Sequence, residues 1–225
     1  MTDKKICSIL FVGLVRGFKY EHTRNNIYKF LLDPLKEQFN LKIFIHTYDK
    51  EFDESIHKLN YEKIIIDSDK EAEDKYIKTI NNYKWQKSIK HDFWRTGWFK
   101  YWNSIYLCNN LRLENEKLNN YKSEWIIITS PQIKPMNIIP DLTKLNKNLY
   151  TPDKYRSGGY YDNFIFGKNK EINYISNLIN WIKTQYNTEI HPETTLKKYI
   201  DLKFKMNFVT ILFNKIRFNN VIVNH

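Results

Sequence analysis

The sequence contains only two cysteines, no long apolar run and no Asn-x-Ser/Thr acceptor for N-linked glycans. Nothing about Cys7 and Cys108 suggests a disulfide framework or a zinc site. They fall in a predicted strand and a predicted helix, where each is typical of a small core residue. No apolar segment approaches the ~20 residues of a membrane span, and residues 1–5 lack the apolar stretch of a signal peptide. We therefore expect a cytoplasmic protein in a reducing compartment, without a transmembrane segment.

The composition is that of a folded protein with a basic surface. Hydrophobic residues make up 42% of the 225 residues and aromatic residues 16%, and the absence of repeats or a clear linker predicts a single domain over residues 1–225. The net charge is +11, but lysines are scattered between acidic residues. A nucleic-acid-binding protein would cluster that charge, and a peripheral membrane protein would place it on an amphipathic helix. The pattern favours a solvated lysine-rich surface, or an enzyme that aims a few cations at a phosphate-binding cleft.

Four short segments are typical of β-strands. Ile6–Val12 is an uninterrupted apolar run that ends at Gly13, as expected for a strand buried on both faces. Residues 41–47, Lys63–Asp67 and Trp125–Thr129 are predicted as the second, third and fourth strands. Because helical segments alternate with them, the sequence predicts an α/β fold with a mostly parallel sheet flanked by helices.

Local signals place the helices. Asp33-Pro34 is predicted to end the first helix and to start a second one, with Asp33 as its cap. Ser68 and Glu71 form a capping box that opens the next helix. Further helical segments are predicted over residues 98–108, over residues 172–182, and from His191-Pro192-Glu193 onwards, before a tail with one or two short strands.

The turn after the first strand is the first candidate for ligand binding, because ligands of α/β sheets bind beyond the carboxyl ends of the strands. Gly13 and Gly17 allow a tight turn and a close approach of the backbone to a ligand. Arg16 supplies a planar fork suited to phosphate. The turn matches neither a dinucleotide fingerprint nor a P-loop, and an ordinary loop with a surface arginine stays open. Thr47 begins a second candidate segment, residues 47–49.

The segment after the fourth strand is the third candidate. A metal-dependent nucleotide-sugar enzyme needs carboxylates here, because Mg²⁺ and Mn²⁺ prefer oxygen ligands. The loop instead contains Ser130, Gln132 and Lys134, without an acid. Lys134, together with Arg16, could neutralise a leaving diphosphate without a metal. A surface turn bounded by prolines is the alternative.

Acidic residues elsewhere offer other chemistry. Asp67-Ser68-Asp69 is the sole Asp-x-Asp, and helix capping is the favoured interpretation, because acids are stabilised at a helix N-terminus. Asp162 follows two glycines and two tyrosines, so it could accept a proton from an attacking sugar hydroxyl or serve as a turn residue. Glu193 is a second candidate acid or a helix-initiating residue. His46 is a weaker candidate at the end of the second strand.

At these residues the chain resembles small GT-A-like glycosyltransferases of giant DNA viruses and some bacteria. Such proteins begin with an apolar strand and a Gly-x-x-Arg-Gly turn, like residues 13–17, and carry an aromatic helix before the fourth strand, like residues 102–111. A Gly-Gly-x-x-Asp-x-Phe-x-x-Gly segment follows, like residues 158–167, and a His-Pro-Glu helix start comes later, like residues 191–193. The resemblance covers residues 5–200 and rests on the order and spacing of these motifs.

The resemblance implies a GT-A-like (Rossmann-like) domain with a nucleotide-binding half over residues 1–135 and an acceptor half over residues 136–225. It implies transfer of a sugar from a UDP- or GDP-linked donor to a hydroxyl of a glycan or glycoprotein, which in viral relatives belongs to capsid or fibre glycans. For a viral protein, the compartment would be the host cytoplasm. By position, Arg16 would contact the nucleotide or its phosphates, and Asp162 would face the acceptor.

One departure from the family leaves the metal question open. The family usually has Arg-x-Asp after the fourth strand, where this sequence has Ser130-Pro131-Gln132. Catalysis without Mn²⁺ or Mg²⁺, a metal ion held elsewhere and loss of activity are the three explanations, and we rank the first highest. A nucleotide-sugar-binding protein without activity, and a basic nucleic-acid-binding protein, remain alternatives, although we expect no nucleic-acid partner.

The sequence thus predicts three sets of site residues. The expected catalytic acids are Asp162 and, second, Glu193. The expected nucleotide-sugar-binding residues are Gly13, Val15, Arg16, Gly17, Thr47, Ser130, Gln132 and Lys134. The expected acceptor-binding residues are Gly159, Tyr160 and Tyr161, because sugars stack on aromatic rings.

Overall fold

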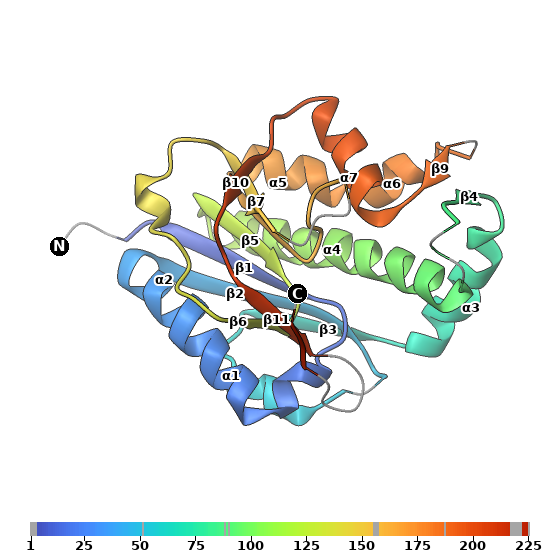
Figure 1. The fold of residues 1–225 in the computed structure, drawn as a ribbon. Coiled ribbons are helices and arrows are strands. Elements are labelled where there is room, and N and C mark those ends of the chain that lie inside the picture. Colours follow the sequence, from blue (N-terminus) through green and yellow to red (C-terminus); the bar gives the residue numbers. More distant parts are fainter. Residues whose placement is uncertain are drawn as a thin grey trace.

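A seven-stranded sheet forms the centre of the protein (Figure 1). The computed structural model describes residues 4–50, 52–87, 89, 91–154, 158–186, 188–216 and 222–224. The strands of this sheet, in spatial order, are β10 (Asn207–Val209), β7 (Leu149–Pro152), β8 (Phe164–Gly167), β5 (Trp125–Thr129), β1 (Ile6–Val12), β2 (Asn40–Tyr48) and β3 (Lys63–Asp67). β5, β1, β2 and β3 are parallel, and β8 is antiparallel to both β5 and β7. The predicted α/β fold with a mostly parallel sheet is confirmed.

The central strand β1 is buried on both faces, as its apolar run predicts. Leu10 and Val12 belong to the core on one side of the sheet, whereas Ile9 and Phe11 belong to the core on the other side. The alternation follows from the two-residue period of side chains along a strand. The predicted bounds of β1, β3 and β5 match the structure, and the predicted second strand, residues 41–47, extends by one residue at each end.

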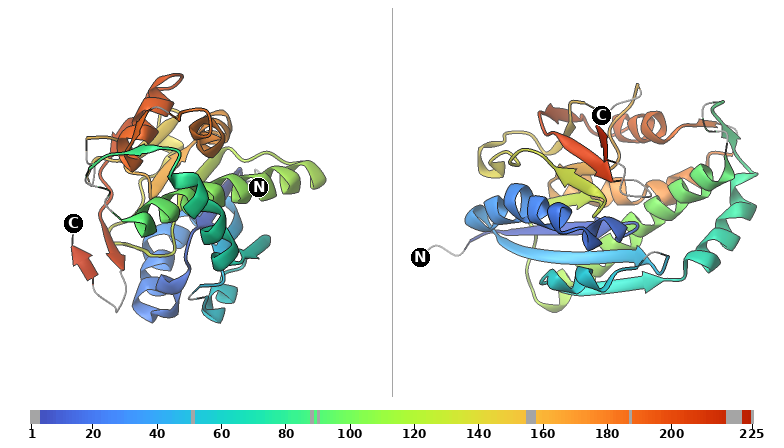
Figure 2. Two further views of the ribbon diagram at one scale, coloured as in Figure 1. Left: turned by 90° about the vertical axis from the view of Figure 1, so that its right-hand side faces the viewer. Right: turned by 60° about the horizontal axis from the view of Figure 1, so that its bottom comes forward.

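Helices cover both faces of the sheet (Figure 2). One face packs against α1 (Glu21–Ile27), the π-helical turn η2 (Tyr28–Leu32), α2 (Asp33–Gln38) and the short helix η3 (Glu54–Lys58). The other face packs against α3 (Asp69–Ile80), α4 (Asp92–Leu118), α5 (Asn169–Ser176), α6 (Leu178–Ile182) and α7 (Pro192–Asp201). Because β7, β8 and β10 belong to the same sheet as β1 and β5, residues from both predicted halves build it.

The prediction at Asp33-Pro34 is confirmed in part: the short helix α2 begins at Asp33 with Pro34 in its first turn, but Asp33 does not cap it. Asp33 has helical torsion angles, with φ −66° and ψ −44°, and the π-helical turn η2 joins α1 to α2 without a cap. A proline in a helix deprives the carbonyl four residues earlier of its N–H donor. That carbonyl belongs to Phe30, and it accepts instead from the backbone N–H of Ile139 at 2.9 Å. An inserted π-turn and a donor from outside the helix therefore replace the lost bond.

The other helix predictions are mostly confirmed. Ser68 caps α3, because its hydroxyl accepts from the backbone N–H of Glu71 at 3.3 Å. α4 covers residues 98–108, and α7 begins at Pro192. The predicted helix over residues 172–182 is divided into α5 and α6 at Asn177.

Short elements complete the described chain. β6 (Ile133–Pro135), β11 (Phe213–Ile216) and β12 (Ile222–Asn224) form an antiparallel sheet, and β4 (Lys84–Trp85) pairs with β9 (Glu189–Ile190). In its described residues, the tail thus has three strands, β10, β11 and β12, rather than the one or two predicted. The remaining short helices are η1 (Arg16–Lys19) and η4 (Leu142–Lys144).

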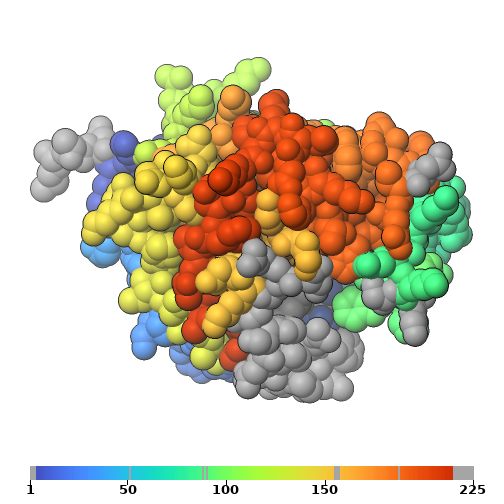
Figure 3. Space-filling view, turned by 45° about the horizontal axis from the view of Figure 1, so that its top comes forward, coloured from blue at the N-terminus to red at the C-terminus, as the bar shows by residue number. Residues whose placement is uncertain are grey.

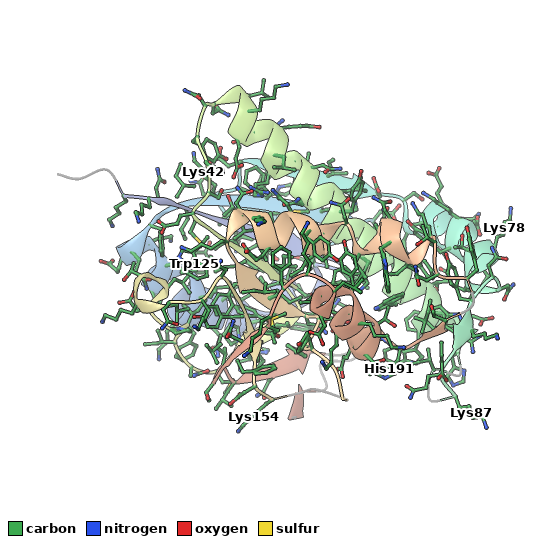
Figure 4. The ribbon with its side chains drawn as sticks, turned by 90° about the horizontal axis from the view of Figure 1, so that it is seen from above. Lys42, Lys78, Lys87, Trp125, Lys154 and His191 are labelled. Atoms are coloured by element: carbon green, nitrogen blue, oxygen red, sulfur yellow. The ribbon has the colours of Figure 1, made fainter. Side chains whose placement is uncertain are left out.

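Lysines lie on several sides of the protein surface (Figure 4). Lys42, Lys78, Lys87 and Lys154 lie on different sides of the molecule, whereas Trp125 lies inside it (Figure 4). Cys7 and Cys108 are buried free thiols, which confirms their prediction as core residues. Within the described ranges, no helix combines the length and the apolar character needed to cross a bilayer.

Candidate functional site

The carboxyl ends of β1 and β5 define the place where a ligand is expected. β1 has β2 on one side and β5 on the other, so the strand order reverses between β1 and β5. In open α/β sheets, ligands bind in the crevice outside the carboxyl ends of the strands at such a switch point. The loops that leave β1 and β5 here are the Gly13–Gly17 turn, residues 13–17, and the Ser130–Lys134 loop, residues 130–134.

The Gly13–Gly17 turn needs both of its glycines. Gly13 has φ +83°, a left-handed conformation that favours glycine. Its N–H is shared between the carbonyl of His46 at 3.2 Å and the hydroxyl of Ser104 at 3.1 Å. A Cβ atom on Gly17 would lie only 2.5 Å from the carbonyl oxygen of Pro131, so the two loops touch through their backbones. Val15, by contrast, is fully buried and serves the core.

Arg16 and Gln132 fasten the two loops together. An Nη2–H of Arg16 donates to Oε1 of Gln132 at 3.3 Å, and Nε2 of Gln132 donates to the carbonyl of Leu14 at 3.2 Å. The hydroxyl of Ser130 accepts from the backbone N–H of Gln132 at 3.3 Å. The sequence prediction that Arg16, Ser130 and Gln132 share one site therefore has a geometric basis. The structure brings these residues into direct contact.

The same contacts show whether the residues after β5 could bind a metal ion. A hard cation needs oxygen ligands, and this loop offers a hydroxyl and an amide but no carboxylate. Both ends of the Gln132 amide already bond to Arg16 and Leu14. Among the described residues, no three His, Cys, Asp or Glu side chains come together as a possible metal-binding group. The residues after β5 do not fit a divalent cation, and metal-free catalysis stays a prediction.

Lys134 lies on β6, two residues beyond Gln132. β6 pairs with β11, and the Cα atom of Lys134 is opposite that of Asn214. The pKa of His22 in α1 is lowered, first by burial and then by the positive charge of Lys134. Lys134 therefore adds a positive charge between β6 and the start of α1, on the same side of the sheet as η1 and Arg16.

Asp162 lies at the same edge of the sheet. Phe164, the first residue of β8, pairs with Thr129, the last residue of β5, so the residues just before β8 lie beside the Ser130–Lys134 loop. Asp162 is 8% exposed, and its Oδ1 accepts from Nδ2 of Asn163 at 2.5 Å. The backbone carbonyl of Asp162 accepts from the hydroxyl of Tyr101 at 2.9 Å. The predicted base is thus close to the predicted phosphate-binding turn, but it is mostly buried.

Gly159 and Glu193 meet through their backbones. A Cβ atom on Gly159 would lie 2.1 Å from the carbonyl oxygen of Glu193, and the N–H of Tyr160 donates to that oxygen at 3.2 Å. Glu193 occupies the first turn of α7, where an acid is favoured by the helix dipole. Glu193 is half-buried, and its backbone contacts Gly159, three residues before Asp162 in the same segment. The surface is hollowed between the orange helix α7 and the green part of α4 (Figure 3).

The two tyrosines predicted to bind the acceptor are part of the core. Tyr160 and Tyr161 are each 7% exposed. The hydroxyl of Tyr160 donates to Oδ1 of Asp201 at 2.6 Å, and the ring of Tyr161 is stacked against Phe213 with centroids 6.3 Å apart. Little of either ring is therefore accessible in this conformation, and their role toward an acceptor remains a prediction.

Thr47 and its neighbours show where the second candidate segment lies. Thr47 is fully buried at the end of β2, whereas Asp49 and Lys50 follow it at the surface. Oδ1 of Asp49 accepts from the backbone N–H of Asp69 at 2.7 Å, which fixes the start of α3. Nζ of Lys100 donates to Oδ1 of the buried Asp69 at 2.8 Å. This pair joins α3 to α4, so Asp69 has a structural partner, consistent with the helix-capping interpretation.

The sequence analysis named His46 as a weaker candidate but did not predict the network that it forms with Ser104 and Asp67 beside the Gly13–Gly17 turn. Nδ1 of His46 lies 2.8 Å from the hydroxyl of Ser104, and Nε2 of His46 lies 3.1 Å from Oδ2 of Asp67. His46 and Ser104 are both fully buried. One signal could have indicated Ser104, because it is a polar residue on the apolar stripe of α4.

A second hollow lies far from this edge. A groove of about 690 Å³ is lined by residues at the amino ends of β1 and β2 together with residues of η2, α2 and η3. Lys4, Lys36 and Lys58 lie around an apolar floor that includes Leu32 and Phe39. None of the sequence-predicted site residues lines it.

Comparisons with known proteins do not assign the chain to a family. A scan against models of protein families finds no match. A search of curated proteins likewise finds no significant match.

Proposed function

We propose that the protein is a GT-A-like glycosyltransferase that transfers a sugar from a UDP- or GDP-linked donor to a hydroxyl of a glycan or glycoprotein. The observation that carries the proposal is the contact between the Gly13–Gly17 turn and the Ser130–Lys134 loop at the switch point of the sheet. Backbone N–H groups and a guanidinium there suit a diphosphate, which carries its negative charge on several oxygens.

The proposed chemistry relies on fixed positive charge rather than on a metal ion. As the sugar–phosphate bond breaks, negative charge develops on the diphosphate, and Arg16 and Lys134 stabilise it. Asp162 takes the proton from the acceptor hydroxyl that attacks the anomeric carbon. Its position beside the Ser130–Lys134 loop supports this role, because base and phosphate site then lie at one edge. Glu193 is the second choice for the base.

The burial of Asp162 places a condition on this role. At 8% exposure, the carboxylate can reach an acceptor hydroxyl only if the ligand approaches along the loop before β8 or if that loop shifts on binding. Catalytic hydrogen bonds are often completed only in the substrate complex. The proposal therefore expects a larger effect of Asp162→Asn on turnover than on nucleotide binding.

A ligand screen followed by a turnover assay tests the proposal. UDP-sugars and GDP-sugars are added with and without Mn²⁺, and a ligand that binds the folded state raises its Tm. Release of UDP or GDP is then measured with the wild type, with Arg16→Ala and with Asp162→Asn. Lys42→Ala, which removes a charge paired with Glu62 elsewhere on the surface, is the control.

Each outcome has a distinct meaning. The proposal expects a Tm increase with one nucleotide class, weaker binding for Arg16→Ala and slower turnover for Asp162→Asn, with Lys42→Ala unchanged. Binding without turnover would favour an inactive nucleotide-sugar-binding protein. No binding of any nucleotide, together with tight and steeply salt-dependent binding of DNA or RNA, would favour the nucleic-acid alternative.

A further inference from the structure

The helix α4 contacts both loops of the candidate site through one face. Tyr101 and Ser104 are three positions apart, so their side chains lie on the same side of the helix. Ser104 reaches the turn after β1, and Tyr101 reaches both that turn and the loop before β8. The two residues come from a helix that packs against β1 and β2, which makes α4 a rigid support for these loops.

Ser104 belongs to a hydrogen-bonded chain whose protons can be assigned. The Asp67 carboxylate can only accept, so Nε2 of His46, at 3.1 Å, carries a proton toward it. Burial lowers the pKa of His46, although the nearby Asp67 opposes this, so the neutral ring is favoured. Nδ1 then accepts from the Ser104 hydroxyl at 2.8 Å, and Oγ of Ser104 in turn accepts from the N–H of Gly13 at 3.1 Å.

With this assignment, both ring nitrogens of His46, the Ser104 hydroxyl and the Gly13 N–H each have a hydrogen-bond partner. The Ser104 hydroxyl also lies 2.9 Å from the carbonyl of His46, which is the alternative acceptor for its proton. That carbonyl receives the Gly13 N–H at 3.2 Å in either arrangement. Because His46 and Ser104 are fully buried, each lost partner would leave a costly unsatisfied group. The chain therefore fixes the backbone of Gly13 firmly.

Tyr101 connects the Gly13–Gly17 turn to the loop before β8, which carries Asp162. A Cβ atom on Gly13 would lie 3.4 Å from Cδ2 of Tyr101, so the ring packs directly against the turn. The hydroxyl of Tyr101 donates to the backbone carbonyl of Asp162 at 2.9 Å. Burial raises the pKa of Tyr101 well above its usual value, which keeps the phenol a proton donor. One side chain thus spans from the predicted phosphate site to the predicted base.

We infer that Tyr101 and Ser104 are positioning residues that fix the loop before β8, which carries Asp162, and the Gly13–Gly17 turn relative to each other. The inference rests on the proposed function. Ser104, through His46, sets the backbone that would meet the diphosphate. Tyr101 sets the loop that would present the base to the acceptor. Substitution of Tyr101 should therefore change kcat, whereas substitution of Ser104 should change the Kd of the nucleotide. This difference separates positioning from a general contribution to stability.

Two substitutions and one matched control test the inference in the full chain. Tyr101→Phe removes only the hydroxyl that holds Asp162, and Ser104→Ala removes the hydroxyl that holds Gly13. Tyr121→Phe is the control, because it removes a comparable bond of 2.7 Å to Asn115 at the far end of α4. The probes are UDP and GDP for binding by calorimetry, and the nucleotide-sugar found to react for kcat and KM. Tm is measured for each variant.

The expected results differ for the two variants. Tyr101→Phe should lower kcat by about tenfold or more with KM within about twofold, because small misplacements of a reacting group slow turnover strongly. Ser104→Ala should raise the Kd of the nucleotide by about fivefold or more, because the turn loses one of its two fixed acceptors. Tyr121→Phe should leave kcat, KM and Kd unchanged, even where its Tm falls.

The inference fails in ways that can be told apart from a failure of the proposed function. Wild-type protein that binds no nucleotide overturns the function and the inference together. Binding and turnover in the wild type, with both variants unchanged or changed only in Tm like Tyr121→Phe, overturn the inference alone. Binding without turnover in the wild type overturns the role of Tyr101, and the Kd of Ser104→Ala then decides the role of Ser104.

Discussion

Replacing Gly17 with alanine should destabilise the protein, because no room exists for the added methyl group. The Cβ atom would lie 2.5 Å from the carbonyl oxygen of Pro131 and 2.9 Å from Cα of Gln132. Both are backbone atoms, so the Gly13–Gly17 turn must move away from the Ser130–Lys134 loop. Overpacking of this kind costs about 2 kcal/mol. For a domain of this size, that loss lowers Tm by about 4–8 °C.

Gly97→Ala is the matched control with the opposite sign. Gly97 lies inside α4, and a Cβ atom there meets nothing within 4 Å. Alanine is favoured over glycine in a helix interior by about 1 kcal/mol, so Tm should rise by about 2–4 °C. Thermal and urea unfolding of both variants give the free energies of unfolding. A Gly17→Ala protein as stable as the wild type, with the same m-value, would refute the close packing of the two loops.

Three further predictions concern buried polar and thiol groups. Glu116→Gln should cost about 3–5 kcal/mol in urea unfolding, because it removes the negative partner of the fully buried Arg112, whose Nη1 lies 2.5 Å from Oε1 of Glu116. Burial lowers the pKa of His46, so the unfolded chain binds this proton more tightly than the folded protein does, and stability should fall as the pH drops below about 6.5; His46→Gln should show a flatter decline between pH 7 and pH 5. Cys7 and Cys108 are fully buried and burial raises the pKa of both thiols, so a thiol reagent should label neither in the native protein and both in guanidinium; rapid native labelling would contradict their burial.

The sheet could be predicted because its strands carry their own signal. β1, β3 and β5 are short apolar runs whose bounds follow from the sequence. Each run contrasts with the polar residues or glycine on either side of it, so its first and last residues can be recognised. The strands β7 and β10 carry weaker signals, because they are short and take their partners from distant parts of the chain. Local patterns do not record such pairings.

The helical segments α1, η2 and α2 follow one another without a break, which shows where a local rule is incomplete. Pro34 is a reliable helix breaker when nothing else satisfies the carbonyl it leaves without a donor. Here Ile139, more than a hundred residues later, donates to that carbonyl on Phe30. The residue that allows Pro34 within this helical segment is therefore far from it in the sequence.

The candidate site was partly predictable for a similar reason. Arg16, Gln132 and Asp162 follow strands or precede one, so the topology alone brings them to one edge. Tyr101 and Ser104 belong to a helix whose stripe reads as core, and only the packing of α4 against β1 shows that they reach the site loops. Tyr160 and Tyr161 are buried by contacts with distant segments, among them Asp201 and Phe213, which their glycine-rich context does not indicate.

The amide at position 132 gives the proposed metal-free mechanism its physical basis. A carboxylate at this position would accept the same N–H from Arg16, but its negative charge would largely cancel the positive charge of the guanidinium. It could then serve the diphosphate only through a bound cation, which would restore the positive charge. Gln132 accepts from Arg16 through a neutral oxygen, so this contact does not cancel the positive charge of the guanidinium. Substituting Asp for Gln132 should therefore weaken nucleotide binding in the absence of Mn²⁺ and make it depend on the metal.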